Sequence, residues 1–116
     1  MIQEAKRLFA RWQRNQALAE QRRTRAREFA RKLAKDLALA DPSVKMIVGF
    51  GSTFESWRSY RLDSDIDLGL YGGNWSLLWS LVPESEFAVS LVELELQPES
   101  FSEQVQMHGE ILYEKQ

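Results

Sequence analysis

Two short segments decide the fold: Val48-Gly49-Phe50-Gly51-Ser52 and, further along the chain, Ser64-Asp65-Ile66-Asp67-Leu68. The first is an apolar run typical of a buried strand, and it leads directly into a Gly-Ser turn. The second alternates polar and apolar residues at its start, as a half-buried strand does. Because residues i and i+2 of a strand point to the same face, Asp65 and Asp67 are expected to lie side by side.

This pair of segments predicts a site for a nucleoside triphosphate and Mg²⁺. Two adjacent carboxylates repel each other unless a cation or a proton lies between them, and Mg²⁺ prefers hard oxygen ligands and substrate phosphates. Asp65 and Asp67 are therefore the predicted metal ligands and catalytic acids. Gly51 allows the backbone to approach a phosphate closely, and Ser52 and the following amides can donate to its oxygens. Gly51 and Ser52 are thus the predicted nucleotide-binding residues.

The elements around these segments alternate between helices and strands. Residues 2–39 contain no Gly or Pro and are rich in good helix formers, which predicts one long helix, or two with a break near Asn15. The first of the two segments is expected to end a strand over residues 44–50, and further strands are expected over residues 87–96 and 111–113. Further helices are expected over residues 74–82, with Asn74 as the cap, and over residues 98–108, ending at Gly109. The predicted fold class is α/β (α+β): a small mixed sheet with flanking helices, preceded by a long basic N-terminal helix.

Composition limits the classes of protein to which the chain can belong. Its 116 residues suffice for one domain, and 44% hydrophobic with 28% charged residues is typical of a globular protein. No apolar run approaches the roughly 18 residues needed to cross a bilayer, so no membrane association is expected. The chain has no cysteine, which excludes disulfides and thiolate metal sites and fits a cytoplasmic location.

Charge is distributed unevenly along the chain. Residues 1–40 hold eleven Lys or Arg residues against four acids, a net charge of +7, whereas the remainder carries −9. A basic helix of this kind can attract nucleic acid, a triphosphate or an acidic partner, or it can simply present a solvated face. Phe9 and Trp12 in the first part of this helix are candidates for contact with a partner or with another subunit.

Gly51-Ser52 followed by Ser64-Asp65-Ile66-Asp67-Leu68 resembles the motif of the minimal nucleotidyltransferase (MNT) domains of the DNA polymerase beta-like superfamily. These domains carry a Gly-Ser, a spacer and a Ser-Asp-x-Asp-hydrophobic strand. The resemblance covers roughly residues 26–114, which predicts a basic helical arm over residues 1–25 and an MNT domain over residues 26–116. It implies an antitoxin partner of a HEPN-domain ribonuclease toxin. Such a protein transfers AMP from ATP, with Mg²⁺, to a hydroxyl such as a toxin tyrosine.

The chain departs from the family pattern at the third carboxylate. The family places this acid on the next long strand, and the matching position here is Ser90. Glu93 and Glu95 share a strand face opposite to that of Ser90, so Glu93 can complete a catalytic set with Asp65 and Asp67 only through a bulge or a shifted register. The alternative is a catalytically degenerate protein that neutralises or scaffolds its partner by binding alone.

The spacer between the two segments also departs from the family. It has Ser56 where a second glycine is usual, and it carries Arg58 and Arg61, each of which can reach a triphosphate or face water.

Self-association and direct nucleic-acid binding through the basic arm are further alternatives.

Overall fold

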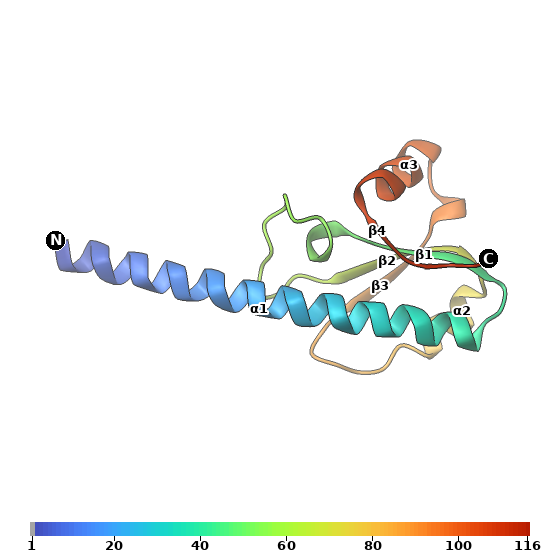
Figure 1. Cartoon of the computed structure of the whole chain (residues 1–116), viewed down its shortest axis with the longest axis horizontal. Helices are drawn as coiled ribbons and strands as arrows, with labels where there is room; N and C mark the ends of the chain where they lie inside the picture. The colour runs from blue at the N-terminus through green and yellow to red at the C-terminus, as the bar shows by residue number, and fades with distance from the viewer. Residues whose placement is uncertain (1) are drawn as a thin grey trace.

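A single long helix dominates the computed structural model, which describes residues 2–116. Helix α1 spans Ile2–Ala40 without interruption, so the alternative break near Asn15 is wrong. Its first half projects beyond the rest of the molecule, and the first side chain buried along it is that of Ala19 (Figure 1). α1 runs straight through the predicted boundary between residues 25 and 26, a division of the chain that stays a prediction. Within residues 2–116 every helix is too short or too polar to traverse a lipid bilayer.

Four strands form one mixed sheet in the order β3-β2-β1-β4. The antiparallel pairs are β1 with β2 and β1 with β4, whereas β2 and β3 run parallel. The strand bounds are β1 Val44–Phe50, β2 Ile66–Gly72, β3 Val89–Glu93 and β4 Glu110–Glu114. The predicted fold class, a small mixed sheet with flanking helices behind a long N-terminal helix, is confirmed.

The third strand is shorter than the sequence suggests. The apolar run continues past Glu93, but its last three residues form the 3-10 helix η2, Leu94–Leu96, in which the Gln97 amide donates to the Leu94 carbonyl. Leu94 is buried there, so the run keeps its apolar contacts while it leaves the sheet.

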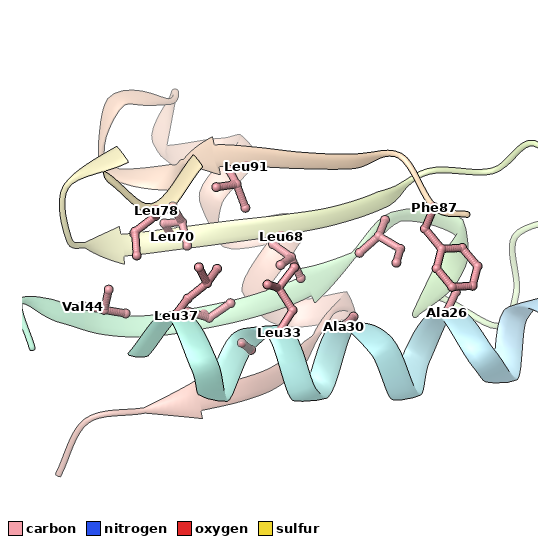
Figure 2. Packing of buried hydrophobic residues seen from close by; sticks show 13 residues of the cluster. Ala26, Ala30, Leu33, Leu37, Val44, Leu68, Leu70, Leu78, Phe87 and Leu91 are labelled. Carbon is pink, nitrogen blue, oxygen red and sulfur yellow. The ribbon is translucent and has the colours of Figure 1, made fainter. Parts of the chain in front are cut away.

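The main core lies between α1 and one face of the sheet. Residues of α1 spaced three or four apart from Ala26 to Leu37 point into it, and the alanines among them let the helix lie close to the strands (Figure 2). Alternate residues of β2 and β3 meet them from the sheet, as the period of two requires. The fully or nearly fully buried members include Ala26, Ala30, Leu33, Leu37, Ile66, Leu68, Leu70 and Leu91.

Helix α3, Glu99–His108, covers the opposite face of the sheet (Figure 1). Val105 of α3 packs with Val48 of β1 and Leu94 of η2 in a smaller second core. Gly109 ends the helix, as predicted, with its amide donating to the Val105 carbonyl at 2.8 Å. A Cβ at Gly109 would lie 2.6 Å from the carbonyl oxygens of Gly49 and Val105, so a side chain does not fit there.

The short helix α2, Trp75–Ser80, follows β2 and confirms another sequence prediction. Asn74 is its N-cap, and the side chain of Asn74 accepts from the Leu77 amide at 3.1 Å. Trp75 and Trp79 stack on each other at 5.8 Å on the surface, and the Trp75 indole donates to the Leu91 carbonyl. This pair joins α2 to β3 at the end of β2 remote from Asp67.

Truncating a core leucine tests the packing of α1 on the sheet. Leu37→Ala should lower the free energy of unfolding by about 2–5 kcal/mol, because Leu37 is fully buried and its loss leaves a cavity. Leu39→Ala is the matched control: Leu39 is 83% exposed on the same helix, and we expect a change within about 0.5 kcal/mol. Urea unfolding of both variants measures the difference. Equal losses would contradict this arrangement of α1.

Candidate functional site

The Gly51-Ser52 turn lies directly against the carboxylate of Asp67. β1 ends at Phe50 and the 3-10 helix η1, Gly51–Thr53, follows at once. Gly51 has a φ of 73°, in the left-handed region that favours glycine. A Cβ at Gly51 would lie 2.3 Å from Oδ2 of Asp67, so no other residue can occupy this position without moving the carboxylate. The structure thus brings together the two segments that the sequence singled out.

The aspartates lie at the start of β2. Asp67 pairs with Phe50 on β1 and with Ser90 on β3, and its side chain lies on the sheet face that α3 covers. Asp65 immediately precedes the strand, is exposed, and its carbonyl accepts from the Thr53 hydroxyl at 2.9 Å. This hydrogen bond ties the start of β2 to η1.

The environment of Asp67 disfavours its charged form. The pKa of Asp67 is raised from its ordinary value to about 6, mainly because the carboxyl is partly buried and also because the negative charges of Asp65 and Glu55 act on it. The positive charge of Arg58 lowers the pKa in part. A bound cation would relieve the same repulsion, so the donor set suits a hard divalent ion.

The carboxylates of Asp65 and Asp67 are the two hard oxygen donors available here. They would hold one Mg²⁺ together with substrate phosphates. Within residues 2–116, no group of three Asp, Glu, His or Cys side chains lies close enough together to hold a metal ion without other ligands. The phosphates of a nucleotide would have to supply the remaining ligands.

Glu93 does not join the aspartates. The parallel register of β2 and β3 is unbroken, with Ser90 opposite Asp67 and Glu93 opposite Leu70. Three residues along a strand correspond to about 10 Å, and the odd offset also turns Glu93 to the other face of the sheet. There it borders a separate hollow with Glu95. The bulge or shifted register that Glu93 needed is not present, and Ser90 stands where a third carboxylate would lie.

Glu55 is a site residue that sequence reasoning missed. Its side chain is buried, its Oε2 accepts from the Gly51 amide at 2.6 Å, and the same oxygen pairs with Nε of Arg58 at 3.1 Å. The carboxylate therefore holds the Gly51 turn and one spacer arginine in place. An acid four residues after the turn glycine and three before an arginine was the available signal.

Two arginines of α1 also hold the turn, through hydrogen bonds to its backbone carbonyls. Arg23 is buried and donates to the carbonyls of Ser52, at 3.1 Å, and Arg58, at 2.6 Å. Arg27 donates to the Thr53 carbonyl at 2.6 Å. Part of the positive charge of the helix thus serves the loop rather than a partner or solvent. No local sequence pattern indicates these contacts, because the two segments are far apart in the chain.

A pocket of about 420 Å³ opens above these residues, between the turn and α3. Gly51, Glu55 and Asp67 form its polar part, and Trp57, Phe101 and His108 contribute aromatic rings. The volume lies in the range of small-molecule sites. The predicted residues Ser52 and Asp65 adjoin this pocket in sequence but do not line it.

The raised pKa of Asp67 predicts a pH-dependent stability. The folded chain binds the proton more tightly than the unfolded chain, so stability falls as pH rises from about 4 through about 6. Asp67→Asn should remove this loss of stability and should raise the free energy of unfolding at pH 7 by about 1 kcal/mol. The gain is smaller than the pKa shift alone implies, because solvent screens the partly exposed carboxylate. Thermal unfolding across this pH range measures it. Asp63→Asn, which removes an equal charge from an exposed position nearby, should retain the dependence. A parallel pH profile in the Asp67 and Asp63 variants would refute the assignment.

Comparison with known proteins relates the fold to toxin–antitoxin structures. A chain in a crystal structure of a toxin-antitoxin with AMP-PNP superposes with a TM-score of 0.58, at 23% identity over 74% of each chain. A chain in a structure of a mutant of the toxin-antitoxin MntA-HpeT gives a TM-score of 0.57, at 22% identity over 74% of each chain. No protein-family model and no curated protein matches the sequence. The likeness shows that this chain has the fold of a chain found in those toxin–antitoxin structures.

Proposed function

We propose that this chain is an MNT-type nucleotidyltransferase and the antitoxin of a toxin–antitoxin pair. It binds a nucleoside triphosphate with Mg²⁺ between the Gly51-Ser52 turn and the pair Asp65 and Asp67. The close packing of Gly51 against the Asp67 carboxylate is the main support for this proposal. It brings a glycine turn that phosphate can approach next to a carboxylate whose charged form a cation would stabilise. The sequence motifs and the AMP-PNP named for one similar structure point the same way.

The reaction in this proposal is transfer of a nucleoside monophosphate to a hydroxyl. The acceptor oxygen forms a bond to the α-phosphorus while the bond from that phosphorus to the bridging oxygen breaks; pyrophosphate leaves and the hydroxyl proton passes to solvent. Mg²⁺ would neutralise charge on the phosphates. This chain's own part is mainly positioning: Ser52 donates to phosphate oxygens, Asp65 and Asp67 hold the cation, and Glu55 with Arg23 keeps the turn in shape.

The proposed acceptor is a tyrosine hydroxyl of a HEPN-domain ribonuclease, and the proposed donor is ATP. The resemblance to MNT domains supports this choice, and the toxin–antitoxin structures with the same fold agree with it. An antitoxin with this activity would silence its toxin by covalent modification, in the cytoplasm where both are made.

Labelling with ATP tests the transfer reaction. Incubation of this chain with α-labelled ATP, Mg²⁺ and its HEPN partner should label the partner, and Asp65→Ala/Asp67→Ala should abolish the label because the cation loses both carboxylates. Asp63→Ala, an exposed acid two residues before Asp65, should label normally. A partner that stays unlabelled with every nucleotide would exclude transferase activity.

Ser90 favours a second candidate function, neutralisation by binding alone. It lies beside Asp67, where the family has an acid, and a serine hydroxyl is not a base at neutral pH. The arm offers a binding surface for this role. Phe9 and Trp12 stack on each other at 5.9 Å and are 58% and 57% exposed on the part of α1 that projects from the body. Large apolar side chains grouped in this way mark protein contact sites.

The two functions differ in which residues neutralisation requires. If binding alone suffices, Phe9→Ser/Trp12→Ser should lower toxin neutralisation at least tenfold, while Asp65→Ala/Asp67→Ala should neutralise like the unchanged chain. Toxin ribonuclease activity, titrated with each variant, measures both. Arg14→Ser on the same exposed stretch is the control for the arm. Neutralisation that persists in the Phe9/Trp12 variant would exclude the arm as the essential contact.

A further inference from the structure

The pocket above the Gly51 turn has two chemically distinct kinds of lining. Gly51, Glu55, Asp67 and the cationic Arg58 are polar or charged and suit a cation with phosphates. Trp57, Phe101 and His108 contribute rings and are called the aromatic half here. Neither the proposed metal ligands nor the proposed phosphate contacts use these rings.

Trp57 is exposed yet has ordered neighbours. It is 66% exposed, and the ring of His108 meets its ring edge to face at 5.9 Å. The guanidinium carbon of Arg58 lies 4.6 Å from the centre of the same ring. Arg58 is itself fixed by its ion pair with Glu55, so the indole is connected through two side chains to the amide of Gly51.

Phe101 of α3 forms another aromatic side of the pocket. It is 39% exposed, and Phe50 supports it from the sheet in an edge-to-face contact at 6.0 Å. Phe50 immediately precedes Gly51, so the Phe101 ring contacts the residue next to the turn. Both Trp57 and Phe101 are thus connected by side-chain contacts to the Gly51 turn.

We propose that the aromatic half, with Trp57 as its principal residue, is the subsite for the nucleobase of the bound triphosphate. This assignment rests on the proposed function and deepens it. A nucleobase presents a flat π-face that stacks on aromatic side chains, and such stacking tolerates every base. Exposed aromatic rings beside a phosphate-type turn provide a surface for that face, and Gln104 adds a neutral group able to donate to and accept from the base edge.

Comparing ATP with tripolyphosphate separates the base subsite from the phosphate site. Calorimetry of the full chain with Mg²⁺ should show ATP binding more tightly than tripolyphosphate. Trp57→Ala should weaken ATP binding about tenfold, which corresponds to about 1.4 kcal/mol, and should leave tripolyphosphate binding unchanged. Trp57→Phe should retain most of the affinity. Trp79→Ala, which removes a tryptophan that is 46% exposed and does not line the pocket, should bind both ligands normally.

The outcomes distinguish the two proposals. If the unchanged chain binds neither ligand, the proposed function fails and the base subsite fails with it. If ATP and tripolyphosphate bind alike, or Trp57→Ala weakens both equally, the phosphate site stands and the base subsite is overturned. Quenching of tryptophan fluorescence by ATP, present in the Trp79 variant and lost in the Trp57→Ala variant, supports the subsite by a second readout.

Discussion

The site depends on a steric constraint where β1 passes into η1. The carboxylate of Asp67 occupies the space that a side chain at residue 51 would need, and Gly51 makes this possible both by lacking a Cβ and by adopting a positive φ. The pairing of Phe50 with Asp67 fixes the same contact from the backbone. A turn suited to phosphate and an acid suited to a cation are thereby held together by the register of two neighbouring strands.

Other contacts reinforce this arrangement from within the loop and from α1. Glu55 holds the Gly51 amide from within the loop, and Arg23 holds the Ser52 carbonyl from α1. Both side chains are buried and charged, and each makes hydrogen bonds that offset the cost of its removal from water. The partly buried Asp67, by contrast, has a raised pKa because burial and neighbouring negative charges disfavour its charged form, as is common for acids at functional sites.

Local signals in the sequence predicted most elements of the fold. The apolar run of residues 44–50 predicts β1 with its observed ends, and Asn74 and Gly109 mark the observed helix ends. The absence of Gly and Pro from residues 2–39 predicts the long helix. The errors arose where tertiary packing decides. Leu94 leaves the strand because the second core accepts it, and Glu93 stays away from Asp67 because the parallel register has no bulge. The role of Arg23 was not predictable, because it depends on the loop meeting a distant part of the chain, whereas Glu55 contacts its sequence neighbours Gly51 and Arg58.

The two arginines that hold the turn belong to the same uninterrupted helix that carries the exposed pair Phe9 and Trp12. One helix therefore connects the Gly51-Ser52 turn with the surface that projects from the body. Linkage is reciprocal: a partner whose affinity for the arm depends on the state of the turn must change the affinity for nucleotide by the same factor. Under the proposed function, the long helix would therefore connect the partner surface with the nucleotide pocket.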